Sequence, residues 1–247
     1  MNELYNLDCV EFMDTCISQG RRFDYCITSP PYNMMLRVRD GIYISRGKNT
    51  HEFSNKYENY NDDLTMDQYF EFLDSVIQRL LKLCKLTFFN IQAITGNKVA
   101  LFNIIGKYSN YIKDIIIWDK VNCQPAMHEN MLNSQFEFIL IFDCDKPYNR
   151  AFDYSGFNRG DESNVWKIKT DRNSFNKASF PEELVARLLD DFTEPNSVIF
   201  DPFMGSGTTG IVCHKKNRDF VGCELVYDMF QIAKSRIDNE CQKKRLF

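Results

Sequence analysis

The segment spanning residues 198–209 constrains the fold of this chain most, because it combines an apolar run, a glycine-rich turn and a helix start. The run Val198-Ile199-Phe200-Asp201 is typical of a buried strand, and Pro202-Phe203-Met204-Gly205-Ser206-Gly207-Thr208-Thr209 follows it directly. Glycines let a backbone approach a ligand closely, and the first N–H groups of a helix are free to bind polar atoms. Glu224 ends the next predicted strand, where an acid can accept hydrogen bonds from ribose hydroxyls. This pattern predicts a nucleoside-type cofactor site; a tight structural turn is the alternative.

The second informative segment is Ser29-Pro30-Pro31-Tyr32, which comes just after Phe23-Asp24-Tyr25-Cys26-Ile27, a run typical of a short buried strand. Each proline lacks an N–H group and has a fixed φ, so the carbonyls of this turn are free to accept hydrogen bonds. Ser29 adds a hydroxyl acceptor, and Tyr32 adds a flat ring that can stack. Acceptors beside a stacking ring suit a planar base with an exocyclic amine, although Pro-Pro-Tyr alone is also common in surface turns.

Apolar runs alternate with helical spacing along the chain, which predicts an α/β fold with a mostly parallel sheet and helices on both faces. We expect strands at about residues 3–8, 24–28, 86–91, 113–118, 136–142, 197–201 and 220–224, and helices at about 9–19, 67–85, 98–108, 181–191, 208–216 and 227–242. A length of 247 residues suits one such domain, so we expect a single domain over residues 1–247. Polar and aromatic stretches at about 34–63 and 145–175 lack this periodicity, and we expect loops there.

The composition indicates a cytoplasmic globular protein. The nine cysteines include no C-x-x-C pair, which favours reduced thiols over a disulfide framework or a zinc site, so no metal is expected. No apolar run approaches the ~18 residues needed to span a bilayer, and the N-terminal residues lack a secretory signal, so no membrane association is expected.

The net charge of −4 argues weakly against nucleic-acid binding, because a phosphate backbone attracts a basic surface. Local clusters nevertheless decide binding, and one basic cluster falls within the loop predicted at 34–63. Its members are Arg37, Arg39, Arg46, Lys48 and Lys56. A solvated face is the common interpretation of such a run, and a nucleic-acid binding site is the alternative.

Taken together, the two motifs resemble those of the amino-group DNA methyltransferases. The catalytic motif of that family is (D/N/S)-P-P-(Y/F/W), and its cofactor motif is D-P-F-x-G-S-G-T-T, which residues 201–209 match nearly letter for letter. Here the catalytic motif precedes the cofactor motif, an order that resembles the circularly permuted beta group. The resemblance covers most of the chain. It implies a Rossmann-like methyltransferase fold, S-adenosylmethionine as the methyl donor, and a prokaryotic or phage-infected cell.

The resemblance also implies roles for individual positions. Ser29 and the carbonyl of Pro30 would hold the target amine, Pro31 would stiffen the turn, and Tyr32 would stack on the base. The positions implied around the cofactor are Asp8, Phe180, Asp201, Phe203, Gly205, Ser206, Gly207, Thr208 and Glu224, with Asp8 on the adenine and Glu224 on the ribose. The family commonly has His in a pattern like H-x-A-x-F-P before the cofactor helix. This chain has Asn176 at that position, so the contact made by that His is in doubt here.

The implied reaction is direct transfer of a methyl group to an exocyclic amine. That nitrogen is a poor nucleophile because its lone pair is delocalised into the ring, so acceptors at its N–H groups would redirect the lone pair and orient it. The base must leave the duplex to reach such a site. Methylation of a ring carbon needs a cysteine, usually in Pro-Cys, and this chain has no such dipeptide. Asn90, Asp119 and Glu137 could be proposed as bases, but a structural role is the favoured interpretation of each.

Serine at the first catalytic position is more typical of N4-cytosine enzymes, and aspartate of N6-adenine enzymes, so the sequence favours cytosine in double-stranded DNA and keeps adenine as the alternative. Further alternatives are an RNA or protein amino-methyltransferase, which the permuted order disfavours, and an inactive DNA-binding subunit. Sequence specificity is expected in residues 34–63 and in about 122–135 or 145–175. A homodimer and a cognate restriction endonuclease are the partners that the resemblance suggests.

Overall fold

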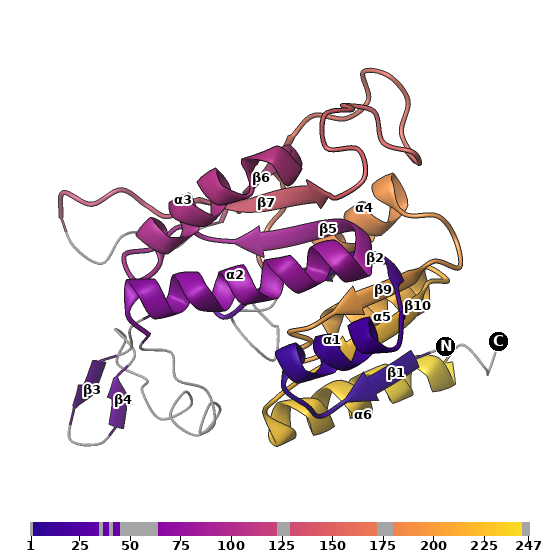
Figure 1. Cartoon of the computed structure of the whole chain (residues 1–247), viewed down its shortest axis with the longest axis horizontal. Coiled ribbons are helices and arrows are strands. Elements are labelled where there is room, and N and C mark those ends of the chain that lie inside the picture. Colours follow the sequence, from indigo (N-terminus) through magenta and orange to yellow (C-terminus); the bar gives the residue numbers. More distant parts are fainter. Residues whose placement is uncertain are drawn as a thin grey trace.

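The structure is a computed structural model that describes residues 2–34, 37–39, 42–44, 64–122, 129–171 and 180–243. An eight-stranded sheet with the order β1-β10-β9-β2-β5-β7-β6-β8 forms its centre (Figure 1). The strands of this sheet are β1 (Asn2–Tyr5), β2 (Phe23–Thr28), β5 (Cys84–Ile91), β6 (Ile112–Asp119), β7 (Phe136–Asp143), β8 (Val165–Lys167), β9 (Val198–Asp201) and β10 (Asp219–Cys223). Only β7 is antiparallel to its neighbours, so the prediction of a mostly parallel sheet is confirmed.

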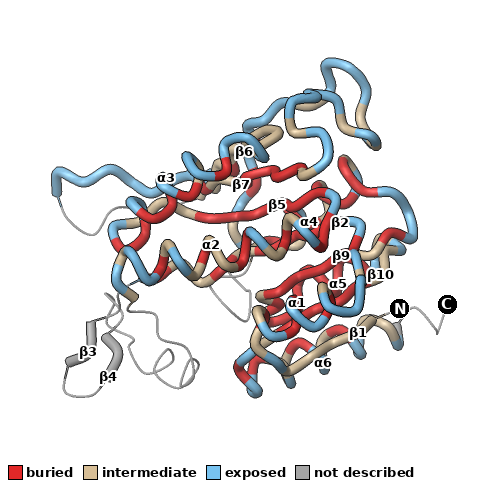
Figure 2. Tube along the Cα trace, in the orientation of Figure 1, coloured by how far each residue is buried: buried red, intermediate tan, exposed pale blue. Residues whose placement is uncertain are grey.

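Within the described ranges, six helices cover the sheet in two layers. They are α1 (Cys9–Ser18), α2 (Met66–Leu83), α3 (Lys98–Lys107), α4 (Glu182–Phe192), α5 (Thr208–Lys215) and α6 (Tyr227–Lys243), and a short 3₁₀ turn covers Ser109–Tyr111. Buried residues of α1, α2 and α3 form one core cluster with the sheet, and buried residues of α4, α5 and α6 form the other. Figure 2 shows the consequence: the strands are mostly buried, and the outward faces of the helices are exposed.

Helix α2 illustrates why these segments fold as they do. Leu73, Val76, Ile77 and Leu80 recur at helical spacing and are buried against the sheet. Thr65 caps the helix by accepting a hydrogen bond from the Gln68 N–H, and the Gln68 side chain accepts one from the Thr65 N–H in return. This capping box satisfies two backbone donors that a helix start otherwise leaves without partners. The helix bounds predicted from spacing therefore agree with the structure to within two residues.

Two parts of the loop prediction are wrong. Residues 37–39 and 42–44 form short antiparallel strands, β3 (Arg37–Arg39) and β4 (Ile42–Ile44), within the segment expected to lack regular structure. Strand β8 lies within the segment 145–175 and pairs with the edge of β6. Its Trp166 is a core residue rather than a DNA-recognition residue, because its ring is buried against Phe192 and covered by the guanidinium of Arg187.

The strand order places β2 and β9 side by side at the centre of the sheet. From β9 the chain continues to β10 on one side of this pair, and from β2 it continues to β5 and then to β6 on the other side. The helices after β2 and β9 cover opposite faces, because α2 belongs to the first core cluster and α5 to the second. In open α/β sheets, such a change of direction opens a crevice at the carboxyl ends of the two strands, where ligands bind.

Three further features of the described residues concern membrane-spanning helices, cysteines and metal ligands. Among the described residues, no helix combines the length and apolar character needed to cross a bilayer. The cysteines of the described ranges are free thiols, and most of them are buried. Over the same ranges, no group of three or more His, Cys, Asp or Glu side chains could hold a metal ion.

Candidate active site

Asp201 ends β9 and connects the two sequence motifs. Its Oδ1 accepts hydrogen bonds from Thr28 Oγ1 at 2.7 Å and from Phe203 N at 3.1 Å, and its Oδ2 accepts one from Thr209 Oγ1 at 2.8 Å. Thr28 is the last residue of β2 and immediately precedes Ser29, whereas Thr209 lies in the first turn of α5. One carboxyl group therefore holds the Ser-Pro-Pro-Tyr segment against the glycine turn.

Burial raises the pKa of Asp201 to about 6, from an ordinary value of 3.8, although its three hydrogen-bond donors oppose the shift. The folded protein therefore binds this proton more tightly than the unfolded chain does. The stabilisation that protonated Asp201 gives the fold is fully present below about pH 4 and is lost as the pH rises through about 6. This changes the free energy of unfolding by up to about 3 kcal/mol.

We expect Asp201→Asn to remove this pH dependence. Asparagine keeps an oxygen that can accept from Thr28 and Phe203, but it does not ionise. The free energy of unfolding of the wild type, minus that of the variant, should fall by up to about 3 kcal/mol between about pH 4 and pH 7. Urea unfolding of both proteins at the two pH values measures this difference. A difference that stays constant with pH would contradict the raised pKa of Asp201.

The glycine turn after β9 adopts left-handed backbone at Gly205 (φ +54°) and Gly207 (φ +82°). Glu224, which follows β10, holds this turn: its Oε2 accepts from the Gly205 N–H and its Oε1 from the Val226 N–H, each at 2.9 Å. Burial raises the pKa of Glu224, while these donors lower it. The carboxylate predicted to bind ribose thus lies directly against the turn predicted to bind the cofactor.

The remaining positions implied around the cofactor differ in how closely they approach this turn. Asp8 follows β1, which pairs with β10, and its Oδ1 caps α1 by accepting from Val10 N at 2.8 Å and Glu11 N at 3.2 Å. Ser206 and Thr208 are buried within the turn and the start of α5, and Phe203 packs on Phe72 of α2. Phe180 precedes α4 and packs on the second core cluster, so its place beside a cofactor stays a prediction.

The Ser-Pro-Pro-Tyr segment is held by its backbone carbonyls. The Pro31 carbonyl accepts a hydrogen bond from Tyr69 Oη at 2.7 Å, and the Tyr32 carbonyl accepts one from Asn97 Nδ2 at 2.9 Å. No described residue donates to the carbonyl of Pro30. This pattern is compatible with the prediction that the Pro30 carbonyl accepts a hydrogen bond from a target amine.

Asn33 is a positioning residue that the sequence analysis missed. It is fully buried with φ +55°, and its side chain donates to the carbonyls of Leu64 and Gly96 and accepts from the Leu64 N–H, each at 2.9 Å. Asparagine tolerates left-handed backbone better than most residues. The available signal was an asparagine directly after a Pro-Pro-Tyr turn, where the chain must change direction.

The hydroxyl of Tyr32 lies at the centre of a polar network. Ser29 Oγ donates to it at 3.1 Å, and it lies 2.7 Å from Glu137 Oε2 and 3.1 Å from Asn90 Oδ1. Burial, followed by the negative charge of Glu137, raises the pKa of Tyr32 well above its ordinary value. Tyr32 therefore keeps its proton and donates it.

The three candidate bases have different surroundings. Glu137 and Asn90 contact Tyr32 directly, so they lie closer to the predicted site than a purely structural role requires. Asp119 instead accepts hydrogen bonds from Val121 N and Gln135 Nε2, and the bond from Gln135 is the main cause of its lowered pKa. Asp119 is therefore a structural residue that holds the turn after β6.

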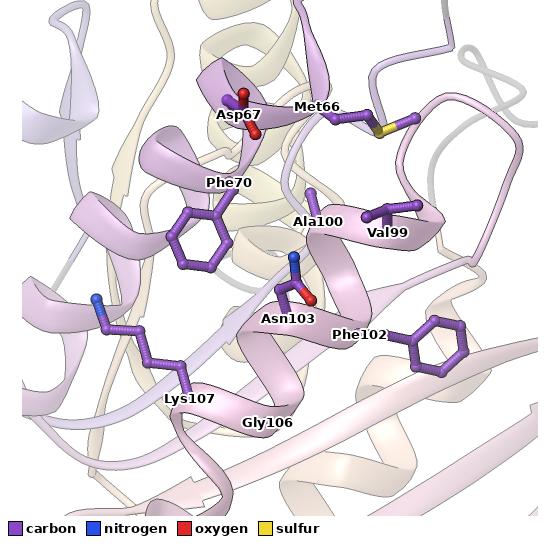
Figure 3. Close-up of a pocket in the computed structure, with 9 residues that line it drawn as sticks. All are labelled: Met66, Asp67, Phe70, Val99, Ala100, Phe102, Asn103, Gly106 and Lys107. Atoms are coloured by element: carbon purple, nitrogen blue, oxygen red, sulfur yellow. The ribbon is translucent and has the colours of Figure 1, made fainter.

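The basic cluster is only partly covered by the structure. Arg37 and Arg39 lie in β3 of the separate two-stranded sheet, while Arg46, Lys48 and Lys56 lie outside the described residues. A hollow of about 530 Å³ lies elsewhere, between α2 and α3, with Phe70 and Lys107 at its wall (Figure 3). None of the residues predicted from the two motifs lines it.

Comparison with known proteins identifies a family. The family model N6_N4_Mtase, described as DNA methylase, matches residues 23–235. Among curated relatives, the type II methyltransferase M.SmaI of Serratia marcescens is 32% identical over 137 residues, which cover 51% of this chain and 46% of the relative. The type II methyltransferase M.Cfr9I of Citrobacter freundii is 30% identical over 138 residues, covering 53% and 45%. The match therefore spans less than half the length of these relatives.

Two solved structures share the fold over nearly the whole chain. The M1.HpyAVI complex with SAM superimposes with a TM-score of 0.66 at 22% identity, covering 96% of this chain and 100% of that one. The PvuII DNA methyltransferase, described as cytosine-N4-specific, gives a TM-score of 0.68 at 14% identity, covering 98% and 90%. At these identities the likeness establishes the fold alone, and the predicted Rossmann-like methyltransferase fold is confirmed.

Proposed function

This chain belongs to the DNA methylase family, and from that premise we propose that it transfers a methyl group from S-adenosylmethionine to the exocyclic amine of a flipped-out base in DNA. The observation that carries the proposal is the carboxyl group of Asp201, which hydrogen-bonds both to Thr28 and to Thr209. Through it, the acceptors of the Ser-Pro-Pro-Tyr segment and the glycine turn adjoin at one end of the sheet. Methyl transfer needs this adjacency, because the reacting atoms must come within about 3–3.5 Å of each other.

The glycine turn suits a nucleoside-type donor with a cationic methyl group. Its left-handed glycines leave room for close backbone approach, and Glu224 adds negative charge beside the turn. In this proposal Asp201 holds the turn in shape, since both of its oxygens already accept internal hydrogen bonds. The residues proposed to surround the donor are Asp8, Phe180, Phe203, Gly205, Ser206, Gly207, Thr208 and Glu224. The donor supplies an activated methyl group, and the chain supplies orientation.

The acceptor side of the reaction is assigned to Ser29, Pro30 and Tyr32. The Ser29 hydroxyl points its proton at Tyr32, which leaves the oxygen lone pairs to accept from an amine. The Pro30 carbonyl would accept the second N–H, and the Tyr32 ring would stack on the base, a contact worth roughly 1–3 kcal/mol by analogy with other base–aromatic pairs. Two acceptors on one amine favour a tetrahedral nitrogen whose lone pair faces the methyl group.

We propose the N4 amine of cytosine as the target, with the N6 amine of adenine as the alternative. The support is Ser29 itself, since serine at this position resembles the cytosine enzymes of the family. Both bases present an amine beside a ring nitrogen, so the acceptor geometry suits either.

Recognition of a DNA sequence is assigned to the segments outside the sheet. The basic cluster containing Arg37 and Arg39 would contact phosphates, which makes binding depend on salt. The curated relatives are named type II methyltransferases, so a cognate restriction endonuclease is proposed as a functional partner, and a homodimer as the assembly.

A labelling experiment tests the proposal. Purified protein is incubated with S-adenosylmethionine carrying a radiolabelled methyl group and with unmethylated DNA of mixed sequence, and the DNA is digested to nucleosides for chromatography. Label in N4-methylcytosine is the expected result. Label in N6-methyladenine would support the same reaction with adenine as the target base. Donor binding without labelled DNA would contradict the proposal that DNA is the substrate.

A further inference from the structure

The polar network around Tyr32 has a defined direction. Glu137 is the terminal acceptor, since an ionised carboxylate can only accept hydrogen bonds. Tyr32 has a single hydroxyl proton, and the 2.7 Å distance to Glu137 Oε2 makes this charge-assisted bond stronger than the 3.1 Å contact with Asn90 Oδ1. The Tyr32 oxygen then accepts the Ser29 proton. The bonds run in one direction, from Ser29 through Tyr32 to Glu137.

The far end of this path is a buried ion pair. Glu137 Oε1 accepts a hydrogen bond from Lys120 Nζ at 2.9 Å, and the two side chains are only 9% and 12% exposed. Lys120 follows β6 and Glu137 lies near the start of β7, so two adjacent strands hold the pair at the same sheet edge as Ser29. A buried carboxylate needs a partner for its charge, and Lys120 supplies it without occupying the oxygen that faces Tyr32.

The Asn90 side chain also contacts the Tyr32 hydroxyl. Its Nδ2 donates to the Phe138 carbonyl at 3.1 Å, which turns its Oδ1 toward the Tyr32 hydroxyl. The Tyr32 hydroxyl is thus contacted by Ser29, Asn90 and Glu137, and it is bound more tightly than base stacking alone requires. Stacking on a base needs only the Tyr32 ring, so it does not account for the hydrogen bonds that connect the Tyr32 hydroxyl to a buried ion pair.

We infer that Ser29, Tyr32 and Glu137 form a relay that removes the proton released by methyl transfer. This inference rests on the proposed function. The amine nitrogen forms a bond to the methyl carbon while the carbon–sulfur bond breaks and leaves its electron pair on sulfur, so the nitrogen becomes positively charged. As this charge develops, in the same step, one of its protons moves to Ser29 Oγ, the Ser29 proton moves to the Tyr32 oxygen, and the Tyr32 proton moves to Glu137 Oε2. The products are a neutral methylated amine and a protonated Glu137, which later returns its proton to water.

In this relay Ser29 touches the substrate, Tyr32 has a second role besides stacking, and Glu137 is a positioning residue that acts through both. The relay works with either base, because cytosine and adenine amines both lose one proton on methylation. It also explains why an ion pair is buried beside a tyrosine at this edge, where an apolar pair would pack equally well.

The test compares single-turnover methyl transfer in H₂O and D₂O for the wild type, Tyr32→Phe and Glu137→Gln. Tyr32→Phe keeps the ring and removes the hydroxyl, while Glu137→Gln keeps the shape and removes the accepting charge. We expect the wild type to be slower in D₂O, and each variant to be about 10²-fold slower than the wild type with the solvent isotope effect abolished. Glu137→Asp should recover part of the rate and of the isotope effect.

Asp119→Asn is the matched control, since Asp119 is a carboxylate at the end of the adjacent strand and lies outside the relay. It should keep the wild-type rate and isotope effect. Rates and isotope effects that stay unchanged in Tyr32→Phe and Glu137→Gln would overturn the relay, and so would slower variants that retain the isotope effect, because that is the result of a purely structural role. A wild type that binds the donor but methylates no DNA would instead overturn the proposed function, and the relay with it.

Discussion

Replacing Ser29 with alanine should lower the single-turnover rate of methyl transfer by about 10²–10³-fold, as removal of one preorganised hydrogen-bonding group does in other enzymes. The substitution removes the acceptor proposed for one N–H of the target amine, as well as the first group of the proposed relay. It leaves the Asp201 hydrogen bonds and the glycine turn intact, because Thr28 and not Ser29 contacts Asp201. Affinity for S-adenosylmethionine should therefore stay at the wild-type value.

Rapid-quench single-turnover kinetics and calorimetric titration of the donor measure these two quantities. Ser18→Ala is the control, since Ser18 is exposed at the end of α1 and its hydroxyl donates to the Thr15 carbonyl of the same helix. An unchanged rate in Ser29→Ala would contradict the assignment. A parallel loss of donor affinity would instead place Ser29 on the cofactor side of the site.

Gly207→Ala should destabilise the fold by about 2–4 kcal/mol, combining left-handed strain with overpacking. Gly207 has φ +82°, and a Cβ at this position would lie 3.0 Å from the Ala233 Cβ and 3.1 Å from the Ile237 Cδ1. Both neighbours belong to α6, so the added methyl would push this helix away from the start of α5. The same movement distorts the glycine turn, so weaker donor binding should accompany the loss of stability.

Urea unfolding with and without the donor measures both effects, and two other glycines separate the causes. Gly205→Ala carries the strain alone, because φ is +54° and the nearest atom is the Phe203 oxygen at 3.8 Å, so it should cost about 1–2 kcal/mol. Gly106 lies within α3, where an added Cβ would point into open space, so Gly106→Ala should stabilise the protein by about 0.5–1 kcal/mol. Equal losses at Gly205 and Gly207 would contradict the packing argument.

The sequence predicts those parts of this protein that depend on local pattern. The glycine turn, the Pro-Pro-Tyr turn and the long helix α2 each carry their own signal, since turn residues and apolar spacing act over a few positions. Strand β8 escaped prediction because it has three residues and only Trp166 is buried, which is too short for an alternating pattern. Strands β3 and β4 are equally short, and among the described strands they pair with each other alone.

Contacts between distant segments could not be predicted from pattern. The hydrogen bond from Thr28 to Asp201 and the ion pair of Lys120 with Glu137 depend on which strands become neighbours. The motif implies that Asp201 lies near the cofactor, but its position at a strand end does not predict which protein groups donate to its carboxylate oxygens. Glu137 was recognised as a polar candidate, but its link to Tyr32 exists only because β7 inserts antiparallel next to β5.

The position of β2 beside β9 also determines how the chain can reach its native state. Thr28 and Asp201 are 173 residues apart, so the central pair of the sheet closes only after most of the polypeptide has been synthesised. Pairing between such distant segments is slow, because a long loop must close before any contact forms. Until then, β2 presents a largely apolar edge with unpaired backbone groups, which favours pairing with other chains. Translation that stops before residue 198 should therefore leave an aggregation-prone fragment, and holdase chaperones that cover exposed strand edges should matter most to this protein during synthesis.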